Sequence, residues 1–384
     1  MNLFPTPTRS LGLVVFVAVV TVFGSLAGAS SALGKPKPPG GAGGASFQGL
    51  GQMPGVVIQP GSCGTQAFGI SGDGSVIVGA GCVSSPSGGT ADQAFRWTAA
   101  GGYQRLGDLG GGTSDAYAAS FDGSVVVGES PPPGAIFGSF RWTAAQGMRS
   151  VPVGCCLQSV TDDGTMVAGG NAWWTTSGQT GTFGNCGDAQ ISLAMVDLSA
   201  DGSVAAGSGP FGTPFMGDFY NAYRSTPAGK CQNIDGHSRN SDAGGISADG
   251  QVIVGEAQAY ANGPYLAFRW TASAGMVNLG DLGGGLSRAD ATNHDGSVVV
   301  GHSTTTTSSG SDHAFIWTAK CGMLDLQTVL QNHGAKIPNG WILQDATDVS
   351  EDGTVITGWG ISPPVQGSKF GQTEPWRVTL PAPC

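Results

Sequence analysis

Charge is scarce in this chain, and positive charge most of all. Lysine and arginine number 16 against 26 aspartates and glutamates, and charged residues make up 11% of the 384 residues. Proteins that bind nucleic acid neutralise its phosphates with lysine and arginine. A net charge of −10 therefore argues against nucleic acid as a partner.

Signatures of catalysis and metal binding are also missing. The sequence has no Gly-x-Ser-x-Gly, no His-Glu-x-x-His and no Cys-x-x-Cys, which argues against a serine hydrolase and a zinc or redox site. Among the five histidines, His302 and His313 bracket one predicted loop and would meet at its base; such a pair is usually incidental. The sequence predicts no metal and no cofactor.

Long hydrophobic runs are confined to the N-terminus. Leu11 to Ala27 is apolar and follows a start with one positive side chain, and small residues stand near Ala29 and Ala32. This pattern is typical of a secretory signal peptide, predicted over residues 1–29, with an uncleaved membrane anchor as the alternative. Residues 30–45 read as a Pro/Gly linker, and no second run reaches spanning length. We expect a secreted or periplasmic protein without a membrane span after cleavage.

Eight cysteines form an even set, which suits an oxidising compartment. Cys63 and Cys82 flank one predicted hairpin, and Cys384 ends the chain after Cys321. These spacings suggest the disulfides Cys63–Cys82 and Cys321–Cys384, while the remaining pairing stays open.

Glycine, by contrast, is abundant at 67 residues, and it recurs in a repeat. The unit S-x-D-G-S-V-V-V-G occurs in seven versions, centred on an Asp-Gly pair that closes a tight hairpin before a buried β-branched strand. Each aspartate is a turn former, because a full repeat separates it from the next. The seven aspartates are Asp73, Asp122, Asp163, Asp201, Asp249, Asp295 and Asp352.

Two further strands follow each hairpin. The third carries a Phe-Arg-Trp pattern, as at 95–97 and 140–142, and the fourth a Leu-Gly pattern, as at 106–107. Four strands in each repeat is the plan of a propeller blade. The last repeat lacks its fourth strand, and residues 47–52 resemble the missing one. We therefore predict an all-β, seven-bladed, monomeric propeller over residues 46–384, closed by its N-terminal strand; a β-solenoid is the runner-up.

These linked motifs resemble the HAF family of extracellular bacterial repeat proteins. The resemblance rests on His313-Ala314-Phe315-Ile316-Trp317, on Leu-Gly-Asp-Leu-Gly-Gly at 106–111 and 279–284, and on the Asp-Gly unit. It covers nearly the whole mature chain and implies export without implying an activity. The third and fourth repeats depart most from the pattern, so strand register is least certain there.

Candidate binding residues gather on one predicted face. Long, unequal loops between second and third strands leave this face, whereas the other face holds the Asp-Gly turns. The loops carry the aromatic candidates Tyr260, Tyr265 and Trp359, which would either contact a ligand or pack the loops onto the blades. Seven residues before each Asp-Gly aspartate, beside the channel, stand Gln66, Asp115, Cys156, Ala194, Asp242, Arg288 and Asp345.

Asp115, Asp242, Arg288 and Asp345 form the convergent polar set. Such a set would hold a cation through its carboxylate oxygens, pair carboxylates as acid and base, or only line a solvated channel mouth. We expect a non-enzymatic binding or scaffold module that holds a carbohydrate or protein partner on the loop-bearing face. The alternative is a carbohydrate-active enzyme, a glycoside hydrolase or lyase, that uses Asp115, Asp242 and Asp345 as acid and base.

Overall fold

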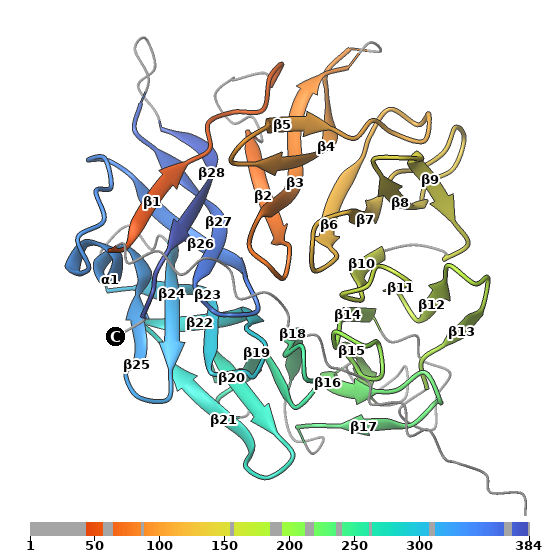
Figure 1. Ribbon diagram of the computed structural model, residues 1–384. Helices are drawn as coiled ribbons and strands as arrows, with labels where there is room; N and C mark the ends of the chain where they lie inside the picture. Colours follow the sequence, from red (N-terminus) through yellow and green to blue (C-terminus); the bar gives the residue numbers. More distant parts are fainter. Residues whose placement is uncertain are drawn as a thin grey trace, which may run out of the picture. The chain divides into compact units, whose positions relative to one another are not determined.

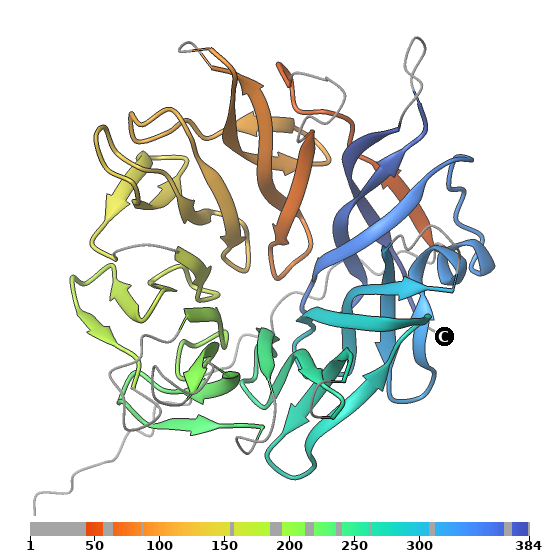
Figure 2. The same cartoon turned by 180° about the vertical axis from the view of Figure 1, so that it is seen from behind.

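The computed structural model describes residues 44–56, 64–85, 88–153, 157–184, 194–211, 219–235, 240–260, 263–306, 312–364 and 371–382. The described strands form seven antiparallel sheets of four strands each, and Figures 1 and 2 show these sheets arranged around a common centre. The predicted seven-bladed propeller is confirmed. The predicted signal peptide, residues 1–29, lies outside the described residues, as does the predicted linker up to residue 43.

Each blade is numbered by its order along the chain, and its strands run from the centre outward. The bounds are β2 (Thr65–Ile70), β3 (Val76–Ser84), β4 (Thr90–Thr98), β5 (Gly102–Arg105); β6 (Asp115–Ala119), β7 (Val125–Glu129), β8 (Ser139–Thr143), β9 (Gly147–Val151); β10 (Leu157–Val160), β11 (Met166–Gly169), β12 (Ala172–Thr175), β13 (Thr180–Thr182); β14 (Ala194–Leu198), β15 (Ala205–Phe211), β16 (Phe219–Ser225), β17 (Cys231–Asn233); β18 (Ser241–Ile246), β19 (Val252–Gln258), β20 (Tyr265–Thr271), β21 (Gly275–Gly280); β22 (Gly283–Thr292), β23 (Val298–Thr305), β24 (Asp312–Thr318), β25 (Gly322–Asp325); and β26 (Ile342–Val349), β27 (Val355–Ser362), β28 (Gln372–Thr379), β1 (Ser46–Gly49).

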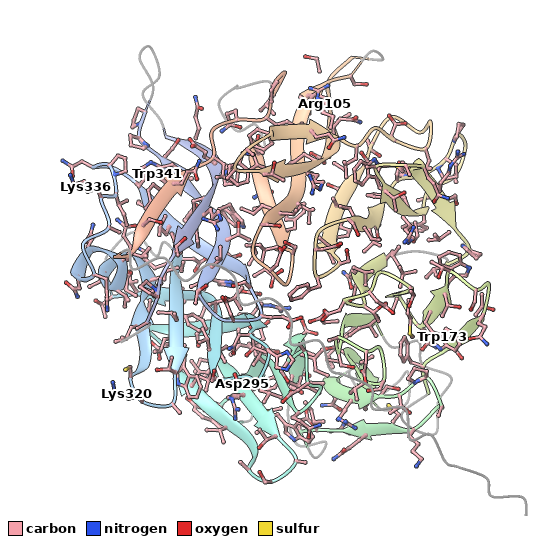
Figure 3. All side chains as sticks on the ribbon, in the orientation of Figure 1. Arg105, Trp173, Asp295, Lys320, Lys336 and Trp341 are labelled. Atoms are coloured by element: carbon pink, nitrogen blue, oxygen red, sulfur yellow. The ribbon has the colours of Figure 1, made fainter. Side chains whose placement is uncertain are left out.

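The Asp-Gly turns join the first strand of each blade to the second, as predicted. In blade 2 the Asp122 carboxylate accepts hydrogen bonds from the Ser124 N–H at 2.9 Å and the Ser120 hydroxyl at 3.0 Å. The backbone bond to the second residue after the aspartate recurs in all seven blades, including that of Asp295, labelled in Figure 3. The interpretation of these aspartates as turn formers is confirmed.

A ring of backbone hydrogen bonds links the seven turns to one another. Each bond joins the stretch just before one Asp-Gly pair to the same stretch of the next blade. The bonds are Asp73 N to Phe121 O, Phe121 N to Asp162 O, Asp162 N to Ala200 O, Ala200 N to Ala248 O, Asp249 N to His294 O, His294 N to Glu351 O, and Glu351 N to Gly72 O, at 2.9–3.1 Å. We call this side of the propeller the turn face.

The N-terminal strand completes the last blade, as predicted. Strand β1 pairs antiparallel with β28, with Ser46 opposite Thr379 and Gly49 opposite Trp376. Phe47 meets Trp341 edge to face, with 5.1 Å between ring centroids, and Figure 3 shows Trp341 beside β1. Joining the two ends of the ring in one sheet covers the edge of β28, which would otherwise offer unpaired backbone groups.

The hydrophobic core lies between neighbouring blades. The β-branched residues of one second strand pack with the third-strand aromatics of the next blade, so that Val76 and Val78 share a cluster with Phe140 and Trp142. The phenylalanines of the Phe-Arg-Trp pattern and the corresponding Trp376 are fully buried: Phe95, Phe140, Phe268, Phe315 and Trp376. Burial of one such ring stabilises the fold by about 1.5–3 kcal/mol.

Several features differ from the sequence-based expectation. The short helix α1 (Leu326–Asn332), capped by Asp325, was not predicted. The second and third strands are also longer than expected, so Trp359 lies within β27 opposite Pro375 and Tyr265 begins β20. The prediction that these two aromatics lie in loops is wrong, because the backbone pairing between the second and third strands extends as far as these residues.

Two sequence-based predictions are left open. Cys63 and Cys384 lie outside the described residues, so the pairs Cys63–Cys82 and Cys321–Cys384 stay predictions.

Among the described residues, no helix is long and apolar enough to cross a membrane.

Candidate functional site: the charged rim

The candidate site lies where first strands begin and second strands end, opposite the turn face. We call this side the rim face. In the six blades where both positions are described, the position seven residues before the Asp-Gly aspartate pairs across the hairpin with the position seven residues after it. This pairing sets Asp115 opposite Glu129, Asp242 opposite Glu256, Arg288 opposite His302, and Asp345 opposite Trp359.

A bulge in the first strand fixes this geometry. In blade 6 the register shifts between Ala289 and Ala291, so that Asp290 is an extra residue without a partner on β23. The shift brings the Arg288 carbonyl so close to Gly301 that a Cβ there would overlap it. The same crowding occurs at Gly128, next to the Asp115 carbonyl. The last residue of each Val-Val-Val-Gly run must therefore be glycine, because any side chain there would overlap the carbonyl of the rim residue opposite.

Six charged side chains from blades 5, 6 and 7 form a connected set, which we call the rim network. Arg288 Nη1 lies 2.9 Å from Asp242 Oδ2 and 3.0 Å from Glu256 Oε1, and its Nε lies 3.0 Å from Asp290 Oδ1. His302 Nδ1 lies 3.0 Å from Asp290 Oδ2 and 3.3 Å from Asp345 Oδ1. Strands β18, β19, β22, β23 and β26 supply these residues.

The protonation of the rim network follows from this geometry. Burial opposes the charged form of His302, but its close contacts with the carboxylates of Asp290 and Asp345 outweigh it and raise the pKa of His302 to about 11. Burial, together with repulsion from Asp345, raises the pKa of Asp290 above its ordinary value. At neutral pH, His302 is thus an imidazolium held between two carboxylates.

A second group, the acidic trio of Asp92, Asp115 and Glu129, lies in blades 1 and 2. Burial, then repulsion from Asp92 and Glu129, raises the pKa of Asp115 to about 6. Burial also raises the pKa of Asp92. The trio concentrates carboxyl groups in this part of the rim.

Two more carboxylates, Asp197 and Asp348, are partly buried in the first strands of blades 4 and 7. Asp348 accepts hydrogen bonds from the Ile70 N–H of blade 1 at 2.8 Å and from Val349 N–H at 2.7 Å. Asp197 likewise accepts a bond from Ile246 N–H of blade 5 at 3.2 Å. Burial raises the pKa of Asp348 to about 7. These two side chains connect neighbouring blades.

The candidate set chosen from the sequence divides between the two groups. Asp242, Arg288 and Asp345 join one network, whereas Asp115 belongs to the acidic trio. Cys156 and the side chain of Ala194 lie outside the described residues. Sequence reasoning missed five charged residues of the rim. Glu129, Glu256 and His302 could have been found by counting seven residues after the Asp-Gly aspartate, whereas Asp290 and Asp92 have no such signal.

His302 and His313 do not form a pair, which agrees with the interpretation of their spacing as incidental. They stand at successive positions of an antiparallel pair, His302 opposite Ala314 and His313 opposite Ser303. Side chains at successive strand positions point to opposite faces of a sheet. His313 instead contacts Asp325, with 2.8 Å between Nδ1 and Oδ2.

Exposed apolar side chains also gather on the rim face. Tyr260, in the loop between β19 and β20, is 66% exposed, and Phe137 and Ile136, between β7 and β8, are 63% and 82% exposed. Tyr220 and Leu286 belong to the same face, at the start of β16 and of β22. Of the large hydrophobic side chains exposed in the described ranges, one lies elsewhere, Val277 in β21.

A cavity of about 390 Å³ lies apart from the rim network, beside the closing strand. Phe47, Trp341, Lys336 and Glu374 contribute to its lining. Glu374 also accepts a hydrogen bond from Gly51 N–H at 2.8 Å, so this wall is tied to the segment that follows β1.

Comparisons with known proteins support the fold. No protein-family model matches the chain, and no curated protein has a similar sequence. The β-propeller domain of the Trilobed protease from Pyrococcus furiosus is 10% identical with a TM-score of 0.51, and the match covers 81% of this chain and 95% of that one.

Two further structures are only partly covered. Puromycin hydrolase is 14% identical with a TM-score of 0.51, over 80% of this chain and 53% of that one. TolB from Acinetobacter baumannii is 13% identical with a TM-score of 0.42, over 64% of this chain and 61% of that one. At these identities, the likeness extends to the propeller fold and not to an activity or a partner.

Proposed function

We propose that this protein is an exported binding or scaffold module that holds a protein partner on its rim face. The observation that carries the proposal is that five of the six large hydrophobic side chains exposed in the described residues lie on this one face, in blades 2, 4, 5 and 6: Ile136, Phe137, Tyr220, Tyr260 and Leu286. Exposed apolar groups beside polar ones mark protein interaction sites. Large hydrophobic anchors supply most of the binding energy at such interfaces.

The loop over residues 130–138 supports this proposal because it is held in shape before any partner arrives. Ser130 N–H bonds the Gly138 carbonyl at 2.8 Å, and Ala135 N–H bonds the Pro132 carbonyl at 3.0 Å. Pro131, Pro132 and Pro133 restrict the backbone further. A rigid loop loses little conformational entropy on binding, so exposed Ile136 and Phe137 are efficient anchors.

The chemistry beside this loop indicates the kind of partner. Glu129 directly precedes the loop and pairs with Asp115, which lies near Asp92. An apolar anchor next to three carboxylates fits a protein surface that has an apolar pocket edged by lysine or arginine. Export is supported by the N-terminal apolar run and by the eight cysteines, and places this partner in the periplasm or outside the cell.

Photo-crosslinking tests the proposal. A photoreactive p-benzoylphenylalanine replaces Phe137 or Tyr260 on the rim face, and a matched variant carries it at exposed Ala145, in the β8–β9 turn on the turn face. We expect the same partner to be crosslinked from both rim positions and not from position 145. The purified partner should then bind the mature protein directly. Equal crosslinking from position 145 would count against a functional rim face.

Incubation with soluble and insoluble polysaccharides tests the two alternatives, a carbohydrate-binding rim and a carbohydrate-active enzyme. If the wild-type protein is retained on a polysaccharide and F137S or Y260S abolishes this retention, the rim binds carbohydrate in place of protein. Release of reducing ends that disappears in D115N, D242N or D345N would show a carbohydrate-active enzyme. We expect neither retention nor release.

A further inference from the structure

The rim network contains three side chains arranged as a metal-binding site. We propose that Asp290, His302 and Asp345 bind one divalent transition-metal ion of the zinc type. One ligand atom from each residue lies within 4.8 Å of the other two. In the part of the chain that the structure describes, no other three histidine, cysteine or acidic side chains meet this spacing. The inference is independent of the proposed protein partner, because it concerns the metal alone.

The distances match those that a metal imposes. Zinc binds imidazole nitrogen and carboxylate oxygen at about 2.0–2.2 Å with tetrahedral angles, which sets its donor atoms about 3.3–3.6 Å apart. His302 Nδ1 lies 3.0 Å from Asp290 Oδ2 and 3.3 Å from Asp345 Oδ1. Two of the three donor separations thus lie within about 0.3 Å of the zinc values, and the third, between Asp290 and Asp345, stays within 4.8 Å.

A second observation comes from Asp345. Its Oδ1 atom is buried, and its contact with His302 Nδ1 at 3.3 Å lacks the alignment of a hydrogen bond, although a buried carboxylate oxygen without a well-aligned donor is costly. The same atom is the one that faces His302. A metal ion between the three side chains would supply the missing partner of this oxygen.

The surroundings hold the ligands in place while leaving access from solvent. Arg288 Nε contacts the Asp290 oxygen that does not face His302, at 3.0 Å, which fixes the orientation of that carboxylate. The side chains of Asp290, His302 and Asp345 are 20%, 29% and 16% exposed. Three protein ligands and an accessible fourth position are the arrangement of an open zinc site.

The ligand types favour a transition metal over calcium or magnesium. An imidazole nitrogen suits zinc, iron or nickel, whereas calcium takes six to eight oxygen ligands and magnesium an octahedron of oxygens. In the metal-free chain the proton on His302 Nδ1 is donated to Asp290 Oδ2 at 3.0 Å. The metal replaces this proton, which passes to solvent.

Isothermal titration calorimetry with Zn²⁺, Ca²⁺ and Mg²⁺ on the metal-stripped mature protein tests the inference. We expect one Zn²⁺ per chain and no saturable binding of the other two ions. D290N, H302N and D345N should each weaken Zn²⁺ binding by about tenfold or more. H313N is the matched control, because His313 lies on the neighbouring strand and contacts one carboxylate only; its Zn²⁺ affinity should be unchanged.

Cobalt gives a second readout that does not depend on the variants. Co²⁺ bound to the wild-type protein should show the intense visible absorption of a four-coordinate site, and Zn²⁺ should abolish it. Far-UV circular dichroism of each variant checks that the propeller is still folded. Absence of Zn²⁺ binding to the folded wild-type protein, or equal loss in H313N and H302N, would overturn the inference.

Discussion

Each Asp-Gly turn packs against the preceding blade. The structure predicts how much the free energy of unfolding changes when this contact is disturbed. Gly123, in the turn of blade 2, has φ +65°, and a Cβ added there would overlap the side chain of Val76 in blade 1. Gly147, in the β8–β9 turn of the same blade, also has φ +65°, but a Cβ there would meet nothing within 4 Å. The two glycines thus share their backbone conformation and differ in the contact.

Alanine at either position carries the strain of a left-handed backbone, about 1–2 kcal/mol. G123A adds the overlap with Val76, about 1–3 kcal/mol. We expect G147A to lower the free energy of unfolding by about 1–2 kcal/mol and G123A by about 2–5 kcal/mol. Urea unfolding followed by tryptophan fluorescence measures both changes.

Shortening Val76 tests whether this contact is the cause. V76A alone should be destabilising because it leaves a cavity, but V76A/G123A should be less destabilised than the sum of the two single variants, by about 1–3 kcal/mol. Additive effects, or a G123A variant no less stable than G147A, would refute the claim that the turn is seated on the neighbouring blade.

Three other predictions concern the partly buried Asp348, the rim network and ring closure. Because the folded pKa of Asp348 is about 7 against 3.8 in the unfolded chain, its ionisation destabilises the fold as pH rises from about 4 to 7; D348N should flatten this part of the urea stability–pH curve. R288M removes the cation that contacts Asp242 and Glu256, while Asp290 keeps its contact with His302. We expect it to cost about 2–3 kcal/mol at pH 7, and less at pH 4, in the same unfolding assay. A chain that starts at Leu50 lacks β1 and should aggregate in size-exclusion chromatography, whereas one that starts at Gly44 should behave as the mature protein.

The overall architecture was predictable because its signals are local and repeated. The Asp-Gly pair fixes a hairpin through bonds between residues two apart, as at Asp122 and Ser124, and seven such hairpins define the blades. Ring closure by Phe47 and its neighbours was predictable because one strand was missing at one end of the repeat series and present at the other.

The site was predicted less completely because its contacts cross between blades. Counting back seven residues located Asp242, Arg288 and Asp345, but Asp290 takes its place in the network through a bulge, which the sequence does not mark. Tyr265 and Trp359 were misplaced because the ends of hairpin strands are set by pairing with a neighbour. Helix α1 is a seven-residue insertion, too short for periodicity to reveal.

The central claim, that the rim face holds a protein partner through its exposed apolar side chains, is tested most directly by the affinity of the partner captured by crosslinking at Phe137. We expect I136S/F137S to weaken binding by at least about 30-fold, which corresponds to about 2 kcal/mol at an interface anchor. V277S, which changes an exposed side chain away from the rim, should bind like the wild type. Wild-type affinity in I136S/F137S, or an equal loss in V277S, would contradict the account.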